Sequence, residues 1–304
     1  MQNGRNYLVR ATAYGGRVRA FSIDTTDVVG DVHRLQGTEP AVTAAIGRLA
    51  TGALMFGAML KHADHSVTVR IQGDGPAGTL LASANGHGDV RGLVSNPTTN
   101  VDQVRDGKLN VSGVVGRNGR LTVARDLGMR RPYVGVVELV SGEVGEDLAH
   151  YLASSEQTPT AVGIGVFVKP SGAVEAAGGY MLQLLPGVGD SEAAEIEAMV
   201  NRLPHPTTML RSGDSPEDIL ERIFPGGFEL IDRRPVRFHC PCSKERVERS
   251  LMLLGADELR AILDNDAARG VTEVVCEFCA ARYELDRAEI EMLIAAVEAG
   301  RRSA

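Results

Sequence analysis

All four cysteines of this 304-residue chain lie in its last quarter, and they are arranged as two pairs. The first pair is Cys240-Pro241-Cys242 and the second is Cys276-Glu277-Phe278-Cys279, with 33 residues between Cys242 and Cys276. Two such pairs can bring four sulfurs to one tetrahedral point, which is the coordination that Zn²⁺ prefers. A CxxC motif alone would fit a thioredoxin-like redox pair equally well. The second pair therefore favours one metal site, with Cys240, Cys242, Cys276 and Cys279 as ligands of one zinc ion per chain.

The CxC spacing of the first pair is unusual for a structural zinc site. Ordinary zinc knuckles separate their two ligands by two to four residues. Two thiols as close as Cys240 and Cys242 can also join in a small, strained disulfide, and strained disulfides are the labile, regulatory ones. His239 adjoins the pair and could replace a sulfur as ligand, but with four cysteines present we interpret it as a bystander. The spacing thus adds redox sensing to metal binding.

The composition is that of a globular protein large enough to bury a core. Hydrophobic residues make up 43% of the chain, and no run reaches the roughly 18 apolar residues of a membrane span. The polar start predicts no secretion signal, so we expect a soluble, cytoplasmic protein whose clustered thiols are metal-bound or redox-active. Tryptophan is absent and aromatics are scarce. Few side chains are therefore available to stack on single-stranded nucleic acid.

Residues 1–187 are predicted to form an α+β domain, a β-sheet with packed helices. The pattern predicts extended segments within 6–24, a short helix to about Gln36 and a longer apolar helix over 41–61. Short strands separated by glycine should follow, and a hairpin turn is expected at Asn118-Gly119. A helix over 146–156 and two more strands complete the domain. The strands are expected at 67–71, 78–82, 88–94, 109–115, 121–123, 134–140, 160–168 and 173–185.

Residues 188–235 are predicted to be an acidic, amphipathic, helical linker. Residues 186–230 carry 9 acidic against 3 basic side chains. Two helices are expected, over 191–203 and 215–224, and Ser215 with Asp218 has the spacing of a capping box. Each helix has one apolar face. Because helices this short are marginal alone, both must dock on another surface to persist.

Residues 236–304 are predicted to form a small zinc-binding domain around the four cysteines. Helices are expected near Val247 to Leu254 and Leu259 to Leu263, and a final helix should start with Asp286 and Glu289 as a capping box. A module of this size buries too little apolar surface to be stable by itself. Zinc binding, about 10–16 kcal/mol at neutral pH, would therefore supply much of its folding free energy.

Other motifs point to weaker hypotheses. Residues 73–78 match the dinucleotide fingerprint GxGxxG, but they contain a proline and lead into a strand, so we interpret them as a turn. No catalytic constellation is recognisable, which predicts that the chain is not an enzyme. One alternative is a thiol oxidoreductase using Cys276 and Cys279. Another is a constitutive zinc-module adaptor that binds nucleic acid or protein through the basic residues Arg233, Arg234, Arg237, Lys244, Arg246 and Arg249.

The whole chain resembles the 33 kDa chaperonin family, the redox-regulated bacterial holdases also called HslO. The resemblance is carried by the CxC and CxxC pairs, by residues 146–159 (EDLAHYLASSEQTP) followed by 161–166 (AVGIGV), and by Pro132-Tyr133-Val134-Gly135 and Gly178-Gly179-Tyr180. The separation of 33 residues between the pairs is slightly longer than the family's usual spacing. This difference concerns the length of a loop rather than the ligand set.

This resemblance implies a redox-regulated, ATP-independent chaperone that holds unfolding client proteins under oxidative and heat stress. It implies that oxidation joins Cys240 to Cys242 and Cys276 to Cys279, that zinc leaves, and that the linker helices release an apolar surface. It further implies a homodimer in the activated state, handover of clients to ATP-dependent chaperones, and no role in binding nucleic acid or membranes.

Overall fold

The computed structural model describes residues 6–99, 101–105, 108–266 and 270–302. The chain divides into two compact units, Met1–His239 and Cys240–Ala304. The first unit combines two large sheets with helices, and the second contains helices and one hairpin. The predicted α+β class is thus confirmed.

Two sheets form the first unit. The five-stranded sheet has the order β10 (Thr160–Val168), β11 (Val174–Leu184), β2 (Val18–Asp24), β1 (Tyr7–Ala13) and β12 (Glu229–Pro235). The six-stranded sheet has the order β13 (Arg237–Phe238), β5 (Asp89–Val94), β4 (Thr79–Asn85), β3 (Ser66–Gly73), β8 (Gly119–Asp126) and β9 (Tyr133–Glu138). Strands β6 (Val104–Arg105) and β7 (Lys108–Leu109) form a short ribbon.

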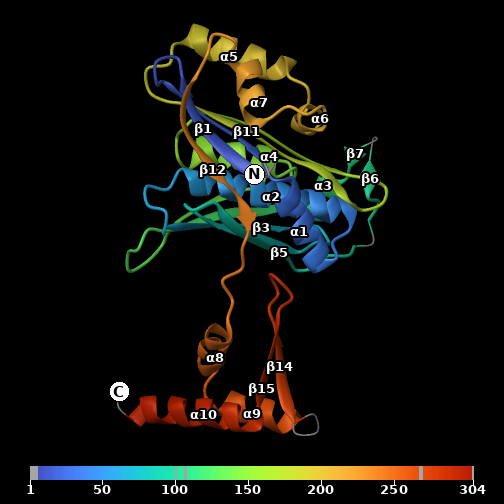
Figure 1. Cartoon of the computed structure of the whole chain (residues 1–304), viewed down its shortest axis with the longest axis vertical. Coiled ribbons are helices and arrows are strands. Elements are labelled where there is room, and N and C mark those ends of the chain that lie inside the picture. The colour runs from blue at the N-terminus through green and yellow to red at the C-terminus, as the bar shows by residue number, and fades with distance from the viewer. Residues whose placement is uncertain (1–5, 100, 106–107, 267–269, 303–304) are drawn as a thin grey trace, which may run out of the picture. The chain divides into compact units, whose positions relative to one another are not determined.

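Helices α1 (Thr26–Gln36), α2 (Pro40–Ala58) and α4 (Gly145–Ser154) lie between the two sheets (Figure 1). The main hydrophobic core fills this layer. Helix α2 packs closely against α4 at Gly52. A Cβ atom at this position would lie only 2.4 Å from the Leu148 side chain, so a larger residue would not fit there without a shift of that side chain. Helix α2 is long and apolar enough to cross a membrane by length and composition, but 94% of its most apolar window is buried inside the fold. It is therefore the central core helix that the sequence predicted.

A second helical layer covers the outer face of the five-stranded sheet (Figure 1). It consists of α5 (Asp190–Arg202), α6 (Pro206–Arg211) and α7 (Pro216–Ile223). The Ser215 side chain accepts from the backbone of Asp218, and the Asp218 carboxylate accepts from the backbone of Ser215, so the predicted capping box is confirmed. Because these helices cover one face and the core helices cover the other, β2 is buried along nearly its whole length.

The structure corrects three local predictions. Residues 111–115 form helix α3 (Val111–Val115) rather than part of a strand, because Asn110 caps the turn by accepting a hydrogen bond from the backbone of Gly113. Asn118 and Gly119 therefore follow a helix and do not form a hairpin turn. Residues 229–235 form β12 at the sheet edge, where the sequence analysis predicted a linker without a strand.

The second unit contains the cysteines. Helices α8 (Lys244–Met252) and α9 (Ala256–Asn265) precede the hairpin of β14 (Val271–Val275) and β15 (Arg282–Asp286), and α10 (Arg287–Arg302) closes the unit. Asp286 and Glu289 accept hydrogen bonds from each other's backbone, as predicted for the start of the last helix. The core among the described residues is small, with six buried side chains: Leu251, Ala256, Leu259, Leu285, Ile290 and Ile294.

The predicted functional division into 1–187, 188–235 and 236–304 remains a prediction. By packing, the linker segment 188–235 belongs to the first unit, since its helices and β12 lie on the five-stranded sheet. The boundary between the compact units falls at His239 and Cys240.

Candidate metal centre

The four cysteines lie together in the second unit. Their sulfur atoms are all within 4.8 Å of one another. The Sγ atoms of Cys240 and Cys276 are 3.7 Å apart, and those of Cys242 and Cys279 are 3.3 Å apart. Four sulfurs bound to zinc at 2.3 Å form a tetrahedron with edges of about 3.8 Å. Both the spacing and the all-thiol donor set therefore suit a metal ion that favours tetrahedral sulfur coordination.

The second cysteine pair sits at the tip of the β14–β15 hairpin. The backbone N–H of Cys276 donates to the carbonyl of Ala281 at 2.9 Å, and the N–H of Ala280 donates to the carbonyl of Cys276 at 2.8 Å. Ala280 adopts a left-handed conformation, with φ of 56°. This tight turn folds the chain back after Cys279, so that both sulfurs of the pair face the same point.

The first cysteine pair lies in an irregular segment between β13 and α8. Ser243 follows Cys242 directly and caps α8 by accepting a hydrogen bond from the backbone of Arg246. The position of Cys242 is thus fixed by the start of a helix, and that of Cys276 by the end of a strand. The metal centre therefore requires the helix and the hairpin to fold together.

Tyr283 is a polar partner of the cluster that the sequence analysis did not single out. Its hydroxyl donates a hydrogen bond to the sulfur of Cys242 at 3.0 Å. This bond raises the pKa of Tyr283 to about 12, so the hydroxyl remains a donor at neutral pH. Burial raises the pKa of Cys242, but hydrogen bonds from Tyr283 and Cys279 outweigh burial and lower the pKa to about 7. The first proton therefore leaves this cluster easily.

The residues that motivated an adaptor function are largely neutralised by acidic partners. Arg233 pairs with Glu217, Arg234 with Asp232, Arg237 with Asp89 and Lys244 with Glu289. His239 is not in the sulfur cluster, and its backbone N–H donates to the carbonyl of Val90 at 2.9 Å. Paired side chains offer little free charge for the phosphates of a nucleic acid.

Comparison with known families identifies one match over most of the chain. The family described as Hsp33 protein matches residues 6–286. The 33 kDa chaperonin of Bacillus subtilis strain 168 is 45% identical over 288 residues, which are 95% of this chain and 98% of that protein. The 33 kDa chaperonin of Geobacillus kaustophilus strain HTA426 is 43% identical over 289 residues, which are 95% and 97% of the two chains.

A solved structure also has the same fold. The crystal structure of the 33 kDa chaperonin (heat shock protein 33 homolog) from Thermotoga maritima superposes with a TM-score of 0.87 and 32% sequence identity. It covers 96% of this chain and 98% of the other chain. The similarity thus extends over both compact units.

Proposed function

Because the chain belongs to the Hsp33 family of 33 kDa chaperonins, we propose that it is an ATP-independent holdase that is activated by oxidation of its four cysteines. Hsp33 is a chaperone family and not an enzyme class. The proposed partners are unfolding client proteins, a second copy of the chain in the activated state, and ATP-dependent chaperones that receive the clients. The proposed location is the cytoplasm.

The observation that carries the proposal is the convergence of four sulfurs in a unit with a very small core. Zinc, when held by Cys240, Cys242, Cys276 and Cys279, would keep the sulfurs as thiolates and supply about 10–16 kcal/mol toward folding of the unit. The six buried side chains among the described residues of this unit contribute far less than the core of the first unit does. The stability of the second unit would thus depend on the chemical state of its sulfurs.

Oxidation changes that state. One peroxide molecule takes two electrons from a pair of thiolates and two protons from the solvent, so that one S–S bond forms, the O–O bond breaks and two water molecules are released. Two peroxide molecules would convert the cluster into two disulfides, for which we propose Cys240 with Cys242 and Cys276 with Cys279. A sulfur in a disulfide is no longer a thiolate ligand. The unit would then lose the interaction that stabilises its fold.

The surface that would bind clients is the outer face of the five-stranded sheet. Helices α5 to α7 cover it with apolar side chains that are at most 4% exposed: Ile196, Met209, Ile219, Leu220, Ile223 and Phe224. Beneath them lie Val9, Ala11, Val18 and Leu182, which are also buried. Release of the linker would expose both surfaces at once. Large exposed apolar patches of this kind bind the apolar segments of unfolding proteins.

The chain connects this surface directly to the cysteines. Strand β12 pairs with β1 at the edge of the five-stranded sheet, β13 pairs with β5 over only two residues, and Cys240 follows after His239. A pairing this short is easily opened when the residues that follow it lose their structure. We infer that unfolding of the second unit frays β13 and β12 and then the linker helices.

The proposal is tested by following light scattering of a heat-denatured client protein. The reduced, zinc-loaded chain should leave aggregation unchanged, and the same chain after peroxide at elevated temperature should suppress it. Dithiothreitol with zinc should restore the inactive state. Equal suppression before and after oxidation would refute redox control.

A further inference from the structure

A pocket of about 720 Å³ lies within the first unit where the linker meets the five-stranded sheet. One wall comes from residues 162–164 of β10, a second from residues 203–206 at the turn from α5 into α6, and a third from Ser112 and Glu143. This volume is in the range of small-molecule sites. The chaperone function proposed above makes no use of the pocket.

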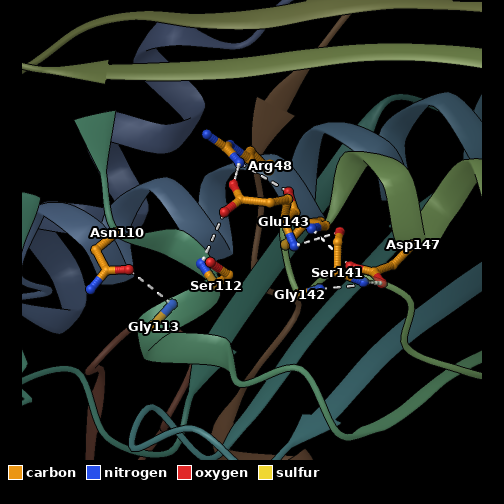
Figure 2. Close-up of polar contacts among 9 residues, drawn as sticks. Arg48, Asn110, Ser112, Gly113, Ser141, Gly142, Glu143 and Asp147 are labelled. Atoms are coloured by element: carbon orange, nitrogen blue, oxygen red, sulfur yellow. Dashed lines mark hydrogen bonds and ion pairs between the residues drawn. The ribbon is translucent and has the colours of Figure 1, made fainter. Parts of the chain in front are cut away.

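Arg48 is one of the charged residues that line this pocket. It lies on the otherwise apolar helix α2, and its side chain is only 15% exposed. Its Nη1 atom donates to the carbonyl oxygen and to Oε2 of Glu143, at 2.9 and 2.8 Å. Figure 2 shows a second terminal nitrogen of Arg48 pointing away from Glu143. The ion pair thus uses one end of the guanidinium and leaves donors for another group.

Both carboxylate oxygens of Glu143 already accept hydrogen bonds from the protein. Its Oε2 accepts from Arg48, and its Oε1 accepts from the backbone N–H of Ser112 at 3.3 Å (Figure 2). These hydrogen bonds lower the pKa of Glu143 although burial, the largest influence, raises it. Glu143 therefore stays ionised and holds Arg48 in place.

Tyr180 supplies a second donor. The residue is 5% exposed and lines the pocket, and among the described residues its hydroxyl has no hydrogen-bond partner. The hydroxyl oxygen is not among the buried polar atoms that lack a partner, so it is in contact with the solvent of the pocket, where a ligand oxygen can replace water as its acceptor. A Cβ at Gly163 would come within 2.5 Å of the Tyr180 ring. The absence of a side chain at Gly163 thus makes room for the Tyr180 ring, whose hydroxyl lies at the pocket wall.

The linker contributes the remaining wall. The ring of His205 packs against Gly165. A Cβ atom at residue 165 would lie only 2.3 Å from the Cε1 atom of His205. The Nδ1 atom of His205 accepts from the backbone N–H of Thr207, which leaves the other ring nitrogen as a donor. Lys108 and Arg117 also line the pocket. The cations of the pocket, Arg48, Lys108 and Arg117, therefore outnumber its carboxylates, Glu143 and Glu146.

We propose that this pocket binds the oxyanion group of a small molecule, a phosphate or a carboxylate, through Arg48 and the hydroxyl of Tyr180. Charged oxygens accept such hydrogen bonds at short distance, and the second terminal nitrogen of Arg48 can donate to one of them. Because one wall is the turn between α5 and α6, a bound anion stabilises the docked linker and disfavours its release. That second consequence depends on the chaperone function proposed above, whereas anion binding does not.

The binding itself is measured by isothermal titration calorimetry of the reduced, zinc-loaded full chain with inorganic phosphate and with succinate, at constant ionic strength set with chloride. Tyr180→Phe removes only the hydroxyl and should weaken affinity about tenfold, as expected for a hydrogen bond to a charged group. The matched control is Tyr133→Phe, since Tyr133 is 51% exposed and does not line the pocket. It should leave the affinity unchanged.

A second variant covers the case in which Tyr180→Phe misfolds. Lys108→Gln changes an exposed residue at the pocket and should weaken binding about threefold, whereas Lys61→Gln, also exposed but outside the pocket, should not. A preference for phosphate or for succinate would identify which oxyanion the pocket takes. Absence of binding of both probes, or equal affinity in wild type, Tyr180→Phe and Lys108→Gln, would overturn the site.

The effect on the linker is measured by trypsin cleavage after Arg202, in the last turn of α5. Cleavage of a helix requires local opening. Saturating anion should slow it about tenfold in the wild type, and less in Tyr180→Phe at the same concentration. If the anion binds but does not slow cleavage, it does not stabilise the docked linker. That result would leave both the anion site and the redox-controlled chaperone function standing.

Discussion

The hydroxyl of Tyr283 lies 3.0 Å from the sulfur of Cys242, and it donates a hydrogen bond to that sulfur. The bond joins strand β15 to the CxC segment, and thus one half of the cysteine cluster to the other. Donors of this kind orient metal ligands and tune their basicity. Tyr283 is therefore a positioning residue of the proposed zinc site rather than a ligand.

Replacing Tyr283 by phenylalanine removes the donor and keeps the ring. We expect zinc affinity to fall about tenfold, the lower end of what loss of an outer-shell partner costs. Competition with a chromophoric zinc chelator measures the change, and Tyr133→Phe, outside the second unit, is the matched control. Unchanged affinity in Tyr283→Phe would mean that the hydrogen bond does not support metal binding.

The docking of the linker should depend on Ile219. This residue of α7 is fully buried against the five-stranded sheet, so Ile219→Ala should cost about 2–5 kcal/mol of local stability. The reduced variant should then suppress client aggregation in part without any oxidant. Ile231→Ala is the control, because Ile231 is 49% exposed on β12. A reduced Ile219→Ala variant as inactive as the wild type would show that linker docking does not control activity.

The ion pair of Arg48 and Glu143 predicts a pH dependence of stability. The hydrogen bonds of Glu143 lower its pKa in the folded state from the ordinary value of 4.5. The unfolded chain therefore binds more protons, so the contribution of Glu143 is fully present above about pH 4.5 and is lost as the pH falls through the folded-state pKa.

Urea unfolding between pH 3 and 7 tests this sign. Glu143→Gln should flatten the loss of unfolding free energy below pH 4.5, whereas Glu146→Gln, a neighbouring exposed residue, should follow the wild type. Parallel curves for all three chains would show that Glu143 does not contribute the acid sensitivity.

Each disulfide should form within one of the two cysteine pairs, one within the CxC motif and the other within the CxxC motif. Two sulfur contacts in the reduced cluster join the CxC pair to the CxxC pair, at 3.7 Å for Cys240 with Cys276 and 3.3 Å for Cys242 with Cys279. All four sulfurs lie within 4.8 Å, so proximity alone does not select a pairing. As the second unit unfolds, loop closure favours partners that are near in sequence.

Peptide mapping of the oxidised chain distinguishes the two outcomes. We expect Cys240–Cys242 and Cys276–Cys279 within separate tryptic peptides. A peptide that joins the two halves through a disulfide would contradict this pairing.

Much of the fold follows from local patterns in the sequence. The CxC and CxxC pairs predicted the sulfur cluster because metal chemistry requires a fixed donor set. Periodicity predicted the central helix α2 and most strands. Helix α3 was missed because Val111, Val114 and Val115 favour a strand by local propensity, whereas its cap and its packing favour a helix. Strand β12 was missed because it is mostly polar and exposed, and pairing with β1 alone defines it.

The sites that sequence reasoning did not find depend on contacts between distant residues. Arg48 and Glu143 are 95 positions apart, and Tyr283 lies 41 positions after Cys242. No local spacing signals such pairs. An arginine in an otherwise apolar helix was the one available hint, since a buried cation requires a partner. Long-range polar pairs of this kind become visible only once the sheets and helices are assembled.

The central claim is that the state of the four cysteines controls chaperone activity. The most direct measurement follows zinc content, free thiols and suppression of client aggregation in one preparation during exposure to peroxide at elevated temperature. We predict that one zinc ion and four thiols are lost in step with the rise of activity. Activity that appears while zinc and thiols remain, or complete loss of both without activity, would contradict the account.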